Sequence, residues 1–160
     1  MLLWYTAVSI LIVANVFRSA GLDYRLVALG ALIPLLVDLA VGHRAFGHTL
    51  VFAVALFVVV MVTTAGRSRL LRRRLLCLPI GVFVALVLSG AFTQDHVFLW
   101  PFLGASLGHD GLLPVWWVVV VEELIGLVGW WWIAGQFDLY LSGPRGDFVR
   151  TGRLWDGTAP

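Results

Sequence analysis

The chain has 160 residues, of which 61% are hydrophobic and 12% are charged, and its formal net charge is +2. In a soluble domain apolar residues make up about half of the chain or less and charged residues about a quarter, so this composition excludes an ordinary soluble domain and indicates an integral membrane protein. All eleven basic residues are arginines, and the single cysteine, Cys77, excludes a disulfide framework and a Cys-x-x-Cys metal site.

The apolar residues gather in five runs that predict an all-α, polytopic bundle of about five transmembrane helices. A helix needs about 20 predominantly apolar residues to cross a bilayer, and the first three runs reach that length only with their flanking residues. The runs cover Leu2–Phe17, Leu26–Val41, Leu50–Thr63, Leu75–Phe92 and Pro114–Phe137. A chain of 160 residues has no room for a second globular domain beside them. We therefore expect one transmembrane domain over residues 1–137.

The arginines predict how this bundle is oriented, because positively charged residues near helix ends prefer the cytoplasmic side of a membrane. With five crossings, ten of the eleven arginines fall on one side. They are Arg18, Arg25, Arg67, Arg69, Arg72, Arg73, Arg74, Arg145, Arg150 and Arg153. We therefore expect a protein of the bacterial plasma membrane with its N-terminus outside and a polar cytoplasmic tail over residues 138–160. We interpret the cluster between residues 67 and 74 as a topology signal that contacts anionic headgroups.

The one arginine outside this pattern is Arg44, in the segment GHRAFGHTL between the second and third runs. His43 and His48 lie in the same segment, and the predicted topology places all four histidines of the chain on the outer side. On a continuous helix His43 and His48 would point about 140° apart. We expect Gly42 and Gly47 to let the backbone turn and bring the two rings together. The segment therefore predicts a polar site at the outer face.

Acidic residues interrupt two of the apolar runs near their outer ends. Glu122 and Glu123 lie in the fifth run, and Asp38 lies in the second. A charged carboxylate at such a depth is costly, so each of these acids must face protein, water or a cation. Glu122 shares a helix face with two glycines that permit close helix contact, and we expect it to point into the bundle. The alternative is that these acids pair with Arg44 or a backbone amide for stability alone.

The segment VFLWPFLG, residues 97–104, is too apolar for a solvated loop and too short to cross a bilayer. We expect it to enter the outer leaflet and to pack over the loop that carries His43 and His48. Trp100 is expected at the membrane interface, and Pro101 is expected to interrupt any helix. The alternative is an interfacial loop that contacts only lipid.

Four segments follow one another in an order that resembles the YdjM-like family of inner-membrane metal-dependent hydrolases: GALIPLLVDL, HRAFGH, LVLSGAF and HVFLWPF. The resemblance covers roughly residues 28–126. The matching residues are Asp38 for the second acid of a PDxxD element, His43, Arg44 and His48 for HRxxxH, Trp100, Pro101 and Phe102 for a WPF loop, and Glu123 with Gly126 for ExxG. The sequence departs from the family pattern at Leu35, Ala85 and Ser89, where the family has an acid, a histidine and an aspartate.

The resemblance implies a divalent metal site for zinc or manganese, whose preferred ligands include imidazoles and carboxylates. The residues concerned are Asp38, His43 and His48 as ligands, Glu122 or Glu123 as a ligand, an orienting residue or a general base, and Arg44 as a clamp for an anionic oxygen. A metal with an open coordination position lowers the pKa of a bound water. The implied function is hydrolysis of a lipid or lipid-linked ester or phosphoester at the outer face of the membrane.

The three departures keep other interpretations open. The chain could be a non-catalytic polytopic membrane protein, either a degenerate relative or an accessory subunit, in which histidines and acids hold the helices in register. A small transporter is a third interpretation. No Ser-His-Asp or Cys-His order and no glycine-rich phosphate loop is visible. The basic loop is too short to predict nucleic-acid binding, so membrane lipids are the predicted partner, and the sequence does not identify a protein partner.

Overall fold

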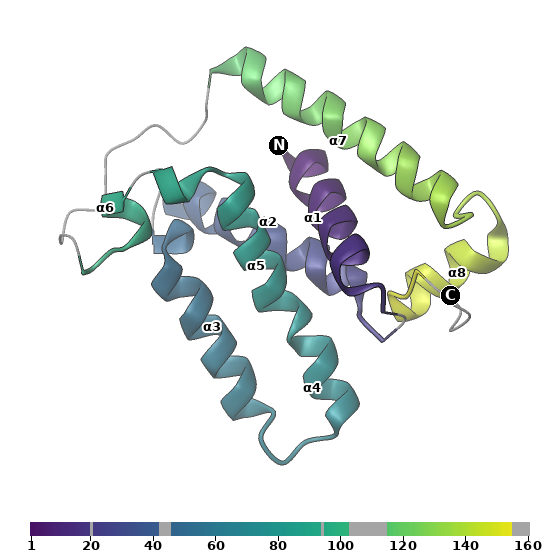
Figure 1. The fold of residues 1–160 in the computed structure, drawn as a ribbon, viewed down its shortest axis with the longest axis horizontal. Coiled ribbons are helices and arrows are strands. Elements are labelled where there is room, and N and C mark those ends of the chain that lie inside the picture. Colours follow the sequence, from purple (N-terminus) through teal and green to yellow (C-terminus); the bar gives the residue numbers. More distant parts are fainter. Residues whose placement is uncertain (20, 42–45, 94, 103–114, 155–160) are drawn as a thin grey trace.

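The computed structural model of the protein describes residues 1–19, 21–41, 46–93, 95–102 and 115–154. Within these ranges the secondary structure is helical and contains no β-strand, which confirms the all-α prediction (Figure 1). The elements are α1 (Leu2–Phe17), α2 (Tyr24–Val41), η1 (Phe46–His48), α3 (Leu50–Thr63), α4 (Arg69–Leu75), α5 (Cys77–Leu88), η2 (Ala91–Thr93), α6 (Asp95–Phe98), α7 (Trp116–Gln136) and α8 (Ser142–Thr151).

Two of these helices, α2 and α7, are long and apolar enough to cross a membrane. Helices α1 and α3 are apolar but shorter, and they have the bounds of the first and third predicted runs. The fourth run, Leu75–Phe92, contains α5, and α4 lies before it except for its last residue, Leu75. Helix α5 ends before Gly90, whose φ of 65° lies in the left-handed region that terminates helices. By length and composition, two helices of the described residues could therefore cross a membrane, and five crossings stay a prediction.

The helices pack in the order α7, α1, α2, α5 and α3, with α2 and α5 in closest association (Figure 1). Glycines allow the backbones to approach closely at two of these contacts, between α2 and α5 and between α1 and α7. A Cβ atom at Gly30 of α2 would collide with the backbone carbonyl of Leu78, and one at Gly81 of α5 would collide with the carbonyl of Val27. On the other side of the bundle, a Cβ atom at Gly126 of α7 would collide with the backbone of α1 at Trp4. Small residues at these crossings let backbones touch, as is common between membrane helices.

The predicted polar tail contains the short helix α8, which docks on the start of α2. The backbone N–H of Tyr24 donates to the carbonyl of Gly152 over 2.8 Å. The Nη1 atom of Arg25 donates to the carbonyl of Val149 over 2.6 Å, and its Nε and Nη2 atoms hold both carboxylate oxygens of Asp23 at 3.2 and 3.1 Å. The tail is thus part of the folded structure at the end of the bundle where α1 joins α2.

Candidate functional site

Asp38 and His48 form a buried acid–imidazole pair at the end of α2 (Tyr24–Val41). Asp38 is 2% exposed and His48 is 6% exposed, and the Nδ1 atom of His48 lies 2.9 Å from the Oδ2 atom of Asp38. This is a hydrogen-bonding distance, but the N–H direction is unsuitable, so Nδ1 makes no hydrogen bond of good geometry within the described residues. A buried carboxylate and an imidazole this close restrict each other's position.

The local sequence explains why His48 is held against α2. A Cβ atom at Gly47 would lie 3.2 Å from the Cα atom of Pro34 and 3.2 Å from the Cβ atom of Val37. Gly47 therefore allows η1 to approach the last turns of α2. Thr49 then caps α3: its hydroxyl accepts a hydrogen bond from the backbone N–H of Phe52 at 3.1 Å and donates one to the carbonyl of Phe46 at 2.7 Å. Sequence analysis missed this cap, although a threonine directly before an apolar run is a known helix-start signal.

His43, Arg44 and Gly42 lie outside the described residues, and so does His109. The structure therefore brings together Asp38 and His48, two members of the predicted site. The expected convergence of His43 with His48 and the position of the Arg44 guanidinium stay predictions.

Glu123 of α7 holds the beginning of α1. Its Oε2 atom accepts a hydrogen bond from the backbone N–H of Leu3 at 3.1 Å, and its Oε1 atom pairs with the amino group of Met1. A carboxylate at a helix N-terminus is stabilising, because the first N–H groups lack partners within the helix and carry partial positive charge. Glu123 thus has a structural role that sequence analysis did not foresee, since it depends on how α7 lies along α1.

Glu122 is half-buried and lies close enough to the Met1 amino group to interact with its charge. On the same side of α7, Gly126 and Gly129 are buried, and a Cβ atom at Gly129 would lie 3.0 Å from the Cβ atom of Ala7. The two glycines therefore face α1, as the prediction of close helix contact required. Both glutamates act at the start of α1.

Two of the three departures from the family pattern are packed among apolar side chains. Ala85 is buried together with Met1, Tyr5 and Ala31, and Leu35 packs against this cluster. The third, Ser89, ends α5 and donates a hydrogen bond to the carbonyl of Leu86 at 3.0 Å. Apolar packing thus occupies the positions where the family pattern has an acid and a histidine.

The donors brought together within the described residues are too few for a metal site. No group of three or more His, Cys, Asp or Glu side chains that could hold an ion occurs in the part of the chain that the structure describes. A catalytic zinc site has three protein ligands. Asp38 and His48 are donors of a suitable kind, and a site at this position needs His43 as well.

Helix α6 lies against η1, on the side of the bundle where His48 is found. Its Val97 is buried, and Phe98 packs on a cluster that includes Ala53 and Leu86. The segment predicted to cover the histidine loop therefore begins beside that loop. Farther along, Trp100 is half-buried and Phe102 is 81% exposed. The depth of this segment in a bilayer stays a prediction.

Comparison with known proteins identifies no relative: no family model, no curated protein and no solved structure matches the chain. The resemblance to the YdjM-like hydrolases therefore depends on the four quoted segments alone.

Proposed function

We propose that the chain is a membrane-embedded metal-dependent hydrolase that acts on a lipid or lipid-linked ester or phosphoester at the outer face of the membrane. The observation that carries this proposal is the buried pair of Asp38 and His48, with 2.9 Å between Nδ1 and Oδ2. Burial of two ionisable side chains in an otherwise apolar bundle is costly, and such residues in membrane helices commonly mark functional sites.

The pair is suited to hold one imidazole nitrogen ready for chemistry. Because Nδ1 faces Asp38, the other ring nitrogen, Nε2, is the one that can serve a ligand or a proton. Asp38 then orients His48, as carboxylates do for metal-binding histidines. A zinc or manganese ion held by His43 and His48, with Asp38 as a ligand or orienting group, would supply an activated water there. Arg44 is proposed to bind the anionic oxygen of the substrate, and Glu122 or Glu123 is proposed as a proton acceptor.

The membrane setting of the proposal comes from the helices. Since α2 and α7 are long and apolar enough to cross a bilayer, the end of α2 that carries Asp38 would lie near the headgroups. The distribution of arginines supports an outer location for this end, a cytoplasmic location for the tail and five crossings of a bacterial plasma membrane. A site at this depth suits a substrate that lies in the bilayer.

A second candidate function is favoured by the packing of Leu35 and Ala85 and by the engagement of Glu123 with α1. In that alternative the chain is a non-catalytic polytopic membrane protein, and the pair of Asp38 and His48 attaches the start of α3 to α2. The pair would then stabilise the fold and turn over no substrate.

One experiment separates the two candidates. The purified protein and its Asp38→Asn and His48→Ala variants are assayed for bound zinc and manganese and for hydrolysis of a fluorogenic phospholipid ester in vesicles. The hydrolase proposal expects Asp38→Asn to lower metal affinity or activity by about 10- to 100-fold. The matched control is Asp138→Asn, which is the same substitution at a residue just after the C-terminal end of α7. Wild-type protein that binds neither metal and shows no turnover would support the non-catalytic candidate.

A further inference from the structure

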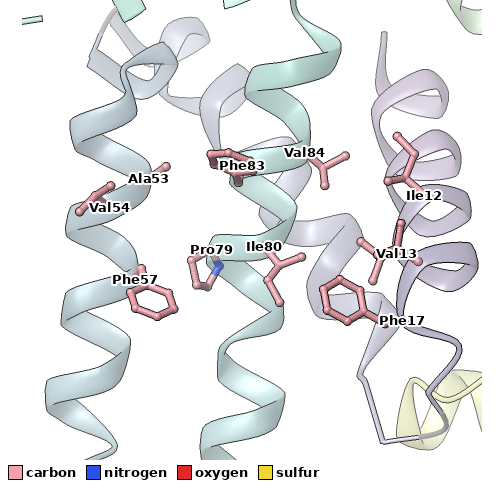
Figure 2. Close-up of a pocket in the computed structure, with 11 residues that line it drawn as sticks. Ile12, Val13, Phe17, Ala53, Val54, Phe57, Pro79, Ile80, Phe83 and Val84 are labelled. Carbon is pink, nitrogen blue, oxygen red and sulfur yellow. The ribbon is translucent and has the colours of Figure 1, made fainter. Parts of the chain in front are cut away.

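An apolar groove runs along α5 (Cys77–Leu88) between α1 and α3. Its volume is about 360 Å³, and it is lined by apolar side chains from all three helices. Figure 2 shows Phe17 of α1 and Phe57 of α3 on either side of Pro79 and Ile80 of α5. Several lining residues are also open to the surroundings, among them Val54, which is 52% exposed. The groove is therefore accessible from the side of the bundle that would face lipid.

The size of the groove suits a hydrocarbon chain. A dry cavity of about 150 Å³ takes up benzene, so the groove, with about 360 Å³, has room for roughly a dozen carbon atoms. The lining offers no polar side chain, and an apolar occupant therefore has no hydrogen bond to satisfy inside it.

Arginines lie at one end of this groove. Helix α1 lines the groove with Val16 and Phe17 and is followed by the exposed Arg18. From the other side, the guanidinium of Arg73 in α4 (Arg69–Leu75) reaches the turn between α1 and α2. A Cβ atom at Gly21 in that turn would lie 2.8 Å from the Nη2 atom of Arg73. Arg73 therefore bridges the gap between α1 and the α4–α5 segment at the end of the groove.

Neither arginine has a carboxylate of the described residues within ion-pair distance. Within the described ranges, the arginine–carboxylate ion pair is that of Arg25 with Asp23, and Arg18 and Arg73 are not part of it. An apolar groove that ends at guanidinium groups outside any such ion pair matches a molecule with a hydrocarbon chain and an anionic head. Guanidinium groups bind phosphate especially well, because the spacing of their N–H donors matches the spacing of two phosphate oxygens.

We propose that this groove is a binding site for an anionic glycerophospholipid, with one acyl chain along α5 and the phosphate at Arg73 and Arg18. The site lies at the arginine-rich end of the bundle, away from Asp38 and His48, and it does not depend on the proposed hydrolase activity. Under the predicted topology, the lipid belongs to the cytoplasmic leaflet. The arginine cluster then has a specific ligand in addition to its role as a topology signal.

The test is native mass spectrometry of the full chain in detergent micelles, with phosphatidylglycerol or phosphatidylcholine of identical acyl chains. The wild-type protein is expected to retain phosphatidylglycerol several-fold more strongly. Arg73→Gln should weaken that retention about fivefold, in line with the effect of one arginine near an anionic lipid. Arg150→Gln in α8 removes the same charge away from the groove and should have no comparable effect.

A second variant tests the groove itself. Val54→Trp fills the groove without altering charge and should weaken retention of phosphatidylglycerol, whereas Val59→Trp, on a part of α3 that does not line the groove, should leave it unchanged. Circular dichroism and thermal unfolding show which variants are folded. If a variant of one pair does not fold, the other pair still tests the proposal.

Three results would overturn the proposal. The first is equal retention of the two lipids by the wild-type protein. The second is an equal loss of retention in Arg73→Gln and Arg150→Gln, or in Val54→Trp and Val59→Trp. The third is a lipid-free dimer that Val54→Trp dissociates, because a second copy of the chain would then occupy the groove.

Discussion

At the scale of single residues, Asp38 and His48 form a contact between two ionisable side chains in a largely apolar chain. Both side chains are buried, and the atoms Nδ1 and Oδ2 are 2.9 Å apart. Each side chain reduces the cost of burying the other, so removal of one leaves the other without its compensation. The pair therefore acts as a unit, in both the catalytic and the non-catalytic proposal.

The coupling between these two residues can be measured. Asp38→Ala and His48→Ala should each lower the free energy of unfolding by about 1–3 kcal/mol. The double variant should lose clearly less than the sum, because the second substitution removes a group that the first has already left unpaired. Chemical unfolding in micelles provides the four free energies. Strictly additive losses would contradict a direct interaction.

Glu123 makes a second prediction at this scale. Glu123→Ala removes the carboxylate that accepts from the N–H of Leu3, and it should lower stability by about 1 kcal/mol, as the loss of a helix cap does. Glu123→Gln retains an accepting oxygen and should lose less. The same unfolding measurement compares the two variants, and an equal loss would argue against capping by the side-chain oxygen.

At the scale of elements, the outcome of sequence analysis depended on how local each signal was. The bounds of α1 and α3 follow from hydropathy alone, because each is an uninterrupted apolar run. The end of α5 depends on the left-handed backbone at Gly90, and the docking of α8 depends on contacts with Asp23 and Arg25, which are distant in the sequence. Asp38 and His48 were predicted as site residues from their types and spacing. The capping role of Glu123 needed the register of α7 on α1, which no local pattern specifies.

The contact between α1 and α7 predicts a sharp difference between two glycines of α7. At Gly126 a Cβ atom would collide with the α1 backbone, whereas at Gly135 nothing lies within 4 Å. Gly126→Ala should therefore destabilise the fold by about 1–3 kcal/mol. Gly135→Ala should be neutral or stabilise by up to about 1 kcal/mol, because alanine is the better helix former. Thermal unfolding in micelles measures both, and similar behaviour of the two variants would disprove the close approach.

At the scale of the whole molecule, the tail joins the fold through hydrogen bonds to the start of α2 and through Phe148 and Leu154, which pack in the apolar core. Gly152 has a φ of 75° and lies directly against the Asp23 carboxylate. A side chain there would be strained in its backbone conformation and would also collide with Asp23. Gly152 is thus one of the positions on which the docking of α8 depends.

Release of the tail can be followed by limited proteolysis. Arg145, Arg150 and Arg153 are exposed in the folded tail, and Gly152→Ala should open the surrounding backbone more often and raise the rate of tryptic cleavage about tenfold, since strain of this kind costs about 1–2 kcal/mol. Gly146→Ala is the matched control, because nothing lies within 4 Å of a Cβ atom at that glycine. Unchanged cleavage in Gly152→Ala would show that the tail is held by other contacts.

The glycine contacts between α2 and α5 also limit how this sequence can diverge during evolution. Leucines and valines that face a neighbouring helix can exchange with one another, because side chains repack. At Gly30 and Gly81 the neighbour is a backbone carbonyl, which cannot move aside without separating the two helices. Descendants of a common ancestor should therefore keep both glycines, 51 residues apart or at an interval altered only by loop insertions, even where the HRxxxH segment has changed beyond recognition.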